Sequence, residues 1–150
     1  MRLVIQRVSE ARVEIDGVVH SAIGHGMLVL VGVQQGDTLD DVRWLAAKTA
    51  ALRIFDDEQG VMNLSVKDVD GKVLAVSQFT LTASTRKGNR PSYIRAAGHE
   101  LAVPLYEAYC DMLSSLLGNE VMQGVFGACM QVSLVNDGPV TIIIDSRLRE

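Results

Sequence analysis

The sequence predicts a single α+β domain, residues 1–150, in which a mainly antiparallel or barrel-like sheet is accompanied by two principal helices. Three observations indicate this fold. Apolar runs of strand length recur along the chain, short turn signals join several of them, and two longer stretches carry apolar residues at helical spacing. No repeat, linker or low-complexity segment divides the chain.

The expected strands are short and rich in branched residues. The clearest local signal is Asp16-Gly17, because this pair suits the positive φ angles of a type I′ hairpin turn. Asn136-Asp137-Gly138-Pro139 separates the last two strands and is expected to form another tight turn. The main strands are expected at residues 1–8, 12–15, 18–23, 27–33, 72–81, 129–135 and 140–145, with shorter ones at 54–55 and 121–126.

Two segments are predicted as helices. The first covers about residues 38–52 and is capped by Asp37. The second begins at Pro104, because the missing N–H of proline costs nothing in a first helical turn, and it ends at Gly118. The residues at helical spacing are Val42, Leu45, Ala46, Thr49, Ala50 and Leu52 in the first segment, and Leu105, Tyr109, Met112, Leu113 and Leu116 in the second.

Composition excludes several classes of protein. The chain is 48% hydrophobic and 21% charged, with a mean hydropathy of +0.20, and this surplus of apolar residues predicts self-association. No apolar run approaches the ~20 residues of a membrane span, and no signal peptide is visible, so we expect no membrane partner and a cytoplasmic location. The net charge of −4 argues against a broadly basic surface for nucleic acid, although Arg86, Lys87, Arg90 and Arg95 form a local positive cluster.

Cysteines and glycines give no sign of a metal or a cofactor. Cys110 and Cys129 stand far apart, without a CxxC motif or a histidine at ligand spacing, so we expect two free thiols and no metal site. The chain has no phosphate-binding loop, and Gly24-His25-Gly26 lacks the third glycine and the following helix of a dinucleotide motif. We therefore expect no cofactor.

The segment 77–81, SQFTL, brings the hydroxyl groups of Ser77 and Thr80 to the end of an expected strand. A Ser-His-Asp arrangement has little support, because the three histidines of the chain lie in separate segments with no visible link to Ser77. Pattern alone favours a strand end with its hydroxyls bonded to the backbone, a core position for Phe79 and a plain turn at 136–139.

Four stretches taken together change that interpretation. MRLVIQRV at 1–8, SQFTL at 77–81, TRKGNRPS at 85–92 and NDGPVT at 136–141 closely resemble the D-aminoacyl-tRNA deacylase family, essentially from end to end. The resemblance implies a homodimeric editing enzyme that hydrolyses the ester between a D-amino acid, or glycine, and the 3′ end of tRNA. Its active site is implied to lie at the dimer interface.

The resemblance also implies roles for individual residues. Gly138-Pro139 is implied to be a cis dipeptide that enters the pocket of the partner subunit and excludes L-amino acids, with Arg7 helping to fix it. Thr80 is a candidate nucleophile. Catalytic roles are implied for Ser77, Gln78 and Thr80, and substrate contacts for Phe79, Gly138, Pro139 and Arg7.

A physical argument supports this reading. An enzyme that accepts many D-amino acids cannot recognise their side chains, so it must distinguish D from L with rigid main chain near the α-carbon. An L side chain would collide with that main chain, whereas glycine has no side chain and would be accepted. Because no base is visible near Thr80, we expect water as the nucleophile, assisted by the ribose 2′-hydroxyl and by backbone N–H groups at the oxyanion. Arg86, Lys87 and Arg90 are expected to contact tRNA phosphates. The alternative is a noncatalytic RNA-binding or dimeric interaction module with the same fold.

Overall fold

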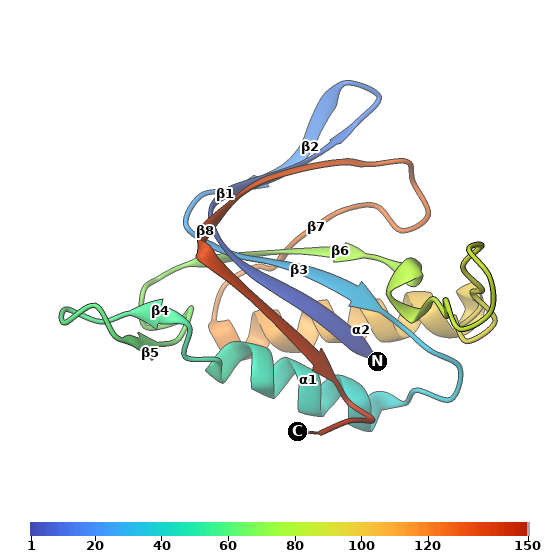
Figure 1. Ribbon diagram of the computed structural model, residues 1–150. Coiled ribbons are helices and arrows are strands. Elements are labelled where there is room, and N and C mark those ends of the chain that lie inside the picture. Colours follow the sequence, from blue (N-terminus) through green and yellow to red (C-terminus); the bar gives the residue numbers. More distant parts are fainter. Residues whose placement is uncertain (150) are drawn as a thin grey trace.

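A six-stranded sheet forms the centre of the computed structural model, which describes residues 1–149 (Figure 1). Its strands are β1 (Arg2–Ile15), β2 (Val18–Ile23), β3 (Gly26–Gly32), β6 (Lys72–Ser77), β7 (Met122–Gln123) and β8 (Gln131–Asp145). The order is β2-β1-β3-β6-β7, with β8 also paired to β1. The remaining elements are the ribbon of β4 (Phe55–Asp56) and β5 (Met62–Leu64), the helices α1 (Leu39–Ala51) and α2 (His99–Leu117), and the short 3₁₀ helix η1 (Phe79–Thr82).

Strand β1 is the axis of the sheet. It pairs antiparallel with β3 through residues 2–8, with β2 through residues 11–15, and with β8 along nearly its whole length. The pairs β3–β6 and β6–β7 are parallel, and each parallel return passes through a helix, α1 before β6 and α2 before β7. The expected α+β domain, with a mostly antiparallel sheet and two principal helices, is therefore confirmed.

Both long helices cover the same face of the sheet (Figure 1). Alternate residues of β1 and β3, including Leu3, Ile5 and Val29, point to that face and are fully buried. They meet the apolar faces of the helices, where Leu45 and Leu113 are also buried. No helix among the described residues is long and apolar enough to cross a membrane.

The opposite face of the sheet carries a second, smaller apolar cluster. Val8, Leu28 and Leu74 are buried in it, whereas Leu30 and Val132 at its margin are only partly buried. Within residues 1–149, the buried residues of both helices pack into the first cluster and none of them packs into this one. This face therefore keeps apolar side chains near solvent.

The last strand differs from the prediction. Residues 131–145 form one continuous strand, not two strands joined by a tight turn. Its first half pairs with residues 8–14 of β1 and its second half with residues 2–6, so that residues 137–140 bulge out opposite Arg7. Sequence periodicity identified both strand-like runs, but it could not show that they share one partner.

The segment expected as one strand over residues 72–81 also changes form. Strand β6 ends at Ser77, and Gln78 still follows β3 because its N–H donates to the carbonyl of Val31 across 2.8 Å. The chain then closes into η1, where the N–H of Leu81 bonds back to the carbonyl of Gln78. The apolar run thus continues past the point where the sheet ends.

The second helix begins earlier than predicted. It starts at His99 instead of Pro104, because the N–H groups of Leu101 and Ala102 already bond to the carbonyl of Gly98. Pro104 lies on the exposed side of the helix, where its missing N–H leaves one backbone carbonyl to solvent.

The first helix is capped by Thr38 and not by Asp37. The Thr38 hydroxyl accepts from the N–H of Asp40, and the Asp41 carboxylate accepts from the N–H of Thr38. Asp37 is buried instead, where it pairs with the amino group of Met1 at 2.7 Å and with Arg147 at 2.8 Å. Of these two neighbouring polar residues, Thr38 therefore caps the helix and Asp37 binds Met1 and Arg147.

Candidate functional site

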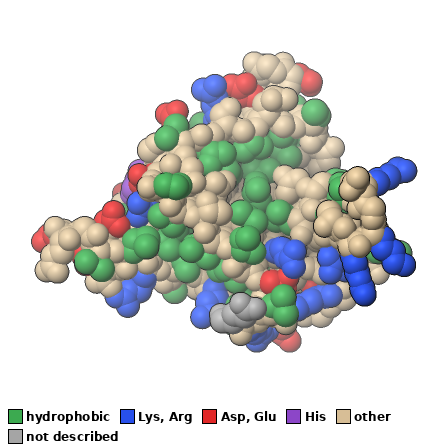
Figure 2. Space-filling view, viewed as in Figure 1, with side chains coloured by type: hydrophobic (Ala, Val, Ile, Leu, Met, Phe, Trp, Pro, Cys, Tyr) green, Lys and Arg blue, Asp and Glu red, His purple; other side chains and the backbone are tan. Residues whose placement is uncertain are grey.

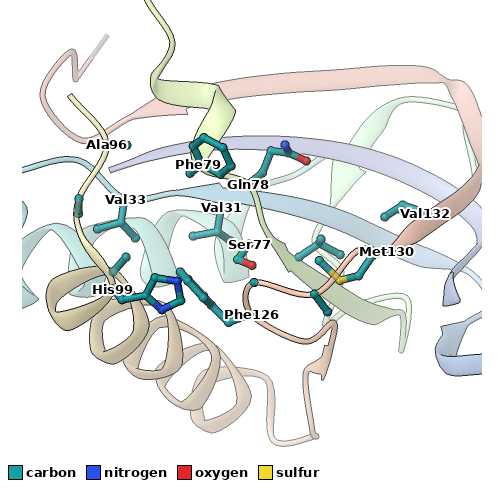
Figure 3. Close-up of a pocket in the computed structure, with 15 residues that line it drawn as sticks. Val31, Val33, Ser77, Gln78, Phe79, Ala96, His99, Phe126, Met130 and Val132 are labelled. Carbon is teal, nitrogen blue, oxygen red and sulfur yellow. The ribbon is translucent and has the colours of Figure 1, made fainter. Parts of the chain in front are cut away.

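A cavity of about 570 Å³ opens where the parallel strands β3 and β6 end (Figure 3). Ser77, Gln78 and His99 are its polar side chains, and the other side chains around it are apolar. The lining residues are Val31, Val33, Val76, Ser77, Gln78, Phe79, Ala96, Ala97, His99, Ala102, Phe126, Gly127, Ala128, Met130 and Val132. A largely apolar cavity with a few convergent polar groups is the usual form of a small-ligand site.

The helix η1 offers two main-chain donors beside this cavity. The N–H groups of Phe79 and Thr80 have no acceptor within residues 1–149, and no side chain caps the start of η1. A side-chain hydrogen bond stabilises the turn, because Thr82 donates its hydroxyl proton to the carbonyl of Phe79 across 2.8 Å. Fixed, unpaired N–H groups of this kind can stabilise a developing oxyanion.

The hydroxyl of Thr80 is already engaged. Its Oγ1 atom accepts a hydrogen bond from the side-chain amide of Gln78. Ser77, Gln78 and Phe79 line the cavity, whereas Thr80 follows them as the second residue of η1. Three of the four residues expected in the segment 77–80 therefore line the cavity, and the fourth, Thr80, is hydrogen-bonded to Gln78.

His99 lies across the cavity from the SQFTL segment, at the start of α2 (Figure 3). Its ring packs edge to face on Phe126, with the ring centroids 5.0 Å apart. Within the described residues no hydrogen bond joins His99 to Ser77, so the structure gives Ser77 no activating base.

Tyr106 lies next to Phe126, on the same helix as His99. Its ring packs against Phe126 at 6.0 Å, and its hydroxyl donates to the carbonyl of Ala75 in β6 across 2.9 Å. Burial raises the pKa of the Tyr106 phenol well above its ordinary value, so the group stays protonated as a structural donor. The side chain joins α2 to the strand that delivers Ser77.

The bulge of β8 forms a second candidate feature. The Gly138-Pro139 peptide bond is cis, as the resemblance implied, and both residues are exposed. Gly138 has a φ of +124°, and a Cβ atom at this position would lie 2.8 Å from the Val140 side chain and 3.1 Å from Arg7. Only glycine fits this position without strain.

Arg7 supports the bulge from β1. The side chain is buried, with 8% of its surface exposed, and its Nε donates to the carbonyl of Asp137 across 3.2 Å. Nη1 donates to the carbonyl of Ile54 at 2.7 Å and contacts the carboxylate of Asp56 at 3.3 Å. The guanidinium therefore ties the residue before Gly138 to two other segments.

Asn136 is a supporting residue that sequence reasoning missed. Its side-chain amide donates to the carbonyl of Arg7 at 3.0 Å and to the carbonyl of Val140 at 3.1 Å. The second bond closes the base of the bulge. Composition marked Asn136 only as a turn former, and nothing in the pattern pointed to a clamp across residues 137–139.

The cavity and the bulge lie far apart in one chain. Arg7 is level with Met27 in β3, whereas Ser77 is level with Val31, a separation of about 13 Å along the strands at ~3.3 Å per residue. Strand β8 reaches the cavity only at its start, through Val132, and Gly138 follows six residues later, about 20 Å along the strand at ~3.3 Å per residue. Gly138 does not reach the Ser77 cavity of its own chain.

Comparison with known proteins places the chain in a family. A family model described as D-Tyr-tRNA(Tyr) deacylase matches residues 4–145. The chain belongs to this family. It is 65% identical to a D-aminoacyl-tRNA deacylase of Akkermansia muciniphila and 62% identical to one of Porphyromonas gingivalis, over the full length of both chains in each case.

Two solved structures share the fold. A probable eukaryotic D-amino acid tRNA deacylase superposes with a TM-score of 0.82 over 95% of this chain and 97% of its own, at 16% identity. A structure named c-Myc DNA Unwinding Element Binding Protein gives a TM-score of 0.92 at 39% identity, over 97% of this chain and 98% of its own. The deacylase fold therefore extends across almost the whole chain.

Proposed function

We propose that the protein is an editing esterase that hydrolyses D-aminoacyl-tRNA to free amino acid and tRNA. The observation that carries the proposal is the cavity bounded by Ser77, Gln78 and Phe79, with unpaired N–H groups at its edge, in a deacylase-family chain. Its relatives of 62–65% identity are named D-aminoacyl-tRNA deacylase. Aminoacyl-tRNA is formed in the cytoplasm, which we infer to be where the protein acts.

The reaction needs no covalent intermediate. Water adds to the ester carbonyl, the N–H groups of Phe79 and Thr80 stabilise the resulting oxyanion, and the bond to the ribose 3′-oxygen then breaks. The neighbouring ribose 2′-hydroxyl assists the proton transfers. The Thr80 hydroxyl accepts from the Gln78 amide and does not attack, because among the described residues no base is hydrogen-bonded to it.

Gly138 and Pro139 serve as the chiral filter. They are exposed on the bulge, and Arg7 and Asn136 hold the adjoining main chain in place. The glycine and proline main chain leaves no room for an L side chain, while D side chains and the hydrogen of glycine are tolerated. Glycine mischarged on tRNA is therefore also a substrate.

The filter acts on the cavity of a second copy of the chain, because it cannot reach its own. The sheet face away from the helices offers the surface for this dimer. Ile143 of β8, which alternates with the helix-facing Ile142 and Ile144, is 67% exposed, and Leu30 is partly buried. Figure 2 shows hydrophobic side chains gathered on the middle of the face that β1 and β8 cross.

A deacylation assay tests the activity. The protein is incubated with tRNA charged with D-tyrosine, L-tyrosine or glycine, and release of the amino acid is followed. We expect rapid release of D-tyrosine and glycine and almost none of L-tyrosine. Release from none of the three substrates would reject the proposal. Sedimentation across a range of concentrations tests the dimer, and a monomer at all concentrations with full activity would reject the filter in trans.

A nucleic-acid-binding role without catalysis is the second candidate. It has support from the 39% identical structure, whose name describes a DNA-binding protein. Binding of uncharged tRNA and of single-stranded DNA with similar affinity, together with no deacylation, would favour this alternative.

A further inference from the structure

The stretch between Asp70 and Glu100 contains no acidic residue. It nevertheless holds Lys72, Arg86, Lys87, Arg90 and Arg95, whereas the other nine basic residues share the rest of the chain with all 18 acidic ones. Figure 2 shows Lys and Arg side chains crowded on the side of the molecule where the loop after η1 projects in Figure 1. Apart from Lys72, which lies at the far end of β6, this positive charge follows the SQFTL segment that lines the cavity, in a protein of net charge −4.

This basic loop, residues 85–91, is closed at its base. Ser84 and Ser92 exchange backbone hydrogen bonds of 2.8 and 2.9 Å. Arg95 adds a bond from its guanidinium to the carbonyl of Ala83 at 3.2 Å. The exposed charges of the loop therefore sit on a fixed base and not on a free tail.

Exposed apolar side chains follow the basic loop. Tyr93 is 40% exposed and Phe79 56%, and their rings pack edge to face at 5.1 Å. Ile94 is 78% exposed, although its main chain is fixed because its carbonyl accepts from the Gln35 amide at 3.0 Å. Since Phe79 also lines the cavity, this apolar surface begins at the cavity wall.

We propose that Tyr93, Ile94 and the basic loop form the docking surface for the unpaired 3′ end of tRNA, upstream of the esterified adenosine. Bases of the single strand stack on Tyr93 and pack against Ile94, and Arg86, Lys87 and Arg90 pair with backbone phosphates. Aromatic stacking beside a positive groove is how proteins hold single-stranded nucleic acid without reading its sequence. The inference rests on the proposed function, because the cavity has to hold the aminoacyl group.

The test compares two substrates and two sets of charge reversals. D-tyrosyl-tRNA reaches the whole surface, whereas D-tyrosyl-adenosine fills only the cavity. Arg86→Glu, Lys87→Glu and Arg90→Glu are combined in one variant. Arg43→Glu, Lys48→Glu and Lys67→Glu, which are also exposed but lie outside the acid-free stretch, form a control variant of equal net charge.

For the loop variant we expect a KM for D-tyrosyl-tRNA at least about tenfold higher, with kcat unchanged. The slope of log affinity for uncharged tRNA against log salt should become shallower by about 2, since each phosphate contact to a single strand contributes ~0.7. Hydrolysis of D-tyrosyl-adenosine should be unaffected, and the control variant should behave as the wild type on both substrates.

Replacing Tyr93 separates stacking from charge. Tyr93→Ala should weaken tRNA binding by about 5- to 150-fold, whereas Tyr93→Phe, which keeps the ring, should bind like the wild type. An unchanged KM and salt slope in the loop variant, or an equal loss on D-tyrosyl-adenosine, would overturn the proposal. If the wild type hydrolyses neither substrate, the proposed function itself fails, and binding of uncharged tRNA still tests the surface.

Discussion

Arg7 donates from Nε to the main-chain carbonyl of Asp137 across 3.2 Å, and so joins the middle of β1 to the residue before Gly138. The same guanidinium donates to the carbonyl of Ile54, which lies just before β4. One buried side chain thus positions a bulge that the sheet itself leaves unpaired.

Replacement of Arg7 should affect both folding and selectivity. Arg7→Ala leaves the Ile54 carbonyl without its donor, which should lower the free energy of unfolding by about 1–3 kcal/mol. Arg7→Lys should keep the charge but lose the geometry, because an ammonium group cannot span both carbonyls. Denaturant titration and the ratio of D- to L-tyrosyl-tRNA hydrolysis measure the two effects. Arg12→Ala, exposed on the same strand, is the control and should change stability by less than about 0.5 kcal/mol.

Gly138→Ala should be more harmful than an alanine at another glycine with positive φ. Gly60 has a φ of +75° and nothing within 4 Å of an added methyl group, whereas the same group at Gly138 meets Val140 at 2.8 Å. Gly60→Ala therefore reports backbone strain alone, about 1 kcal/mol. We expect a larger loss of stability for Gly138→Ala, with reduced hydrolysis of D-tyrosyl-tRNA. Equal melting temperatures for the two variants would contradict this account.

Thr80→Ala should remain clearly active, because water is the nucleophile in the proposed reaction. Loss of a covalent nucleophile typically lowers kcat by a factor of about 10⁴ or more, whereas loss of an orienting contact to Gln78 should cost less than about 100-fold. Single-turnover deacylation of D-tyrosyl-tRNA distinguishes these ranges. Thr80→Ser, which keeps the hydroxyl, controls for the missing methyl group. A 10⁴-fold loss in a folded alanine variant would restore Thr80 as the nucleophile.

The two cysteines should differ in reactivity. Cys110 is fully buried, and burial raises the pKa of its thiol to about 12, whereas Cys129 is exposed. A thiol reagent at pH 8 should therefore titrate one group in the native protein and two in denaturant. In Cys129→Ser the native protein should give no rapid reaction, and a rapid reaction there would show that the core around Cys110 opens easily.

Alkaline pH should destabilise the protein. An unfolded cysteine loses its proton near its ordinary pKa of 9, whereas folded Cys110 keeps it until about pH 12. The unfolded state thus releases protons first, so the free energy of unfolding falls with rising pH, by at most about 1.4 kcal/mol per pH unit for each such group. Burial also raises the pKa of Tyr109, which adds to the effect above pH 10. Denaturant midpoints from pH 8 to 11 measure it, and Cys110→Ala should flatten the curve.

Local chemistry predicted the local structure well. The Asp16-Gly17 turn is confirmed, with φ angles of 51° and 76°, because the turn type is set by the two residues that form it. The first helix is confirmed for the same reason, since the apolar spacing of Val42, Leu45 and Ala46 requires only neighbours along the chain.

Long-range relationships could not be read in the same way. The run 129–145 looked like two strands around a turn, and only the pairing of both halves with β1 makes it one strand with a bulge. The clamp by Asn136 and the unpaired N–H groups at Phe79 and Thr80 are also products of tertiary geometry. Sequence named the segments of the site, but the contacts that support the bulge depend on residues more than a hundred positions away.

The bulge of β8 has paired strand on both sides and no loop of its own. Sites carried by strands hold their geometry more tightly than sites on loops, and they do not open separately from the sheet. Selectivity for D over L substrates should therefore stay nearly constant as the temperature rises, and should disappear only with the unfolding of the whole domain.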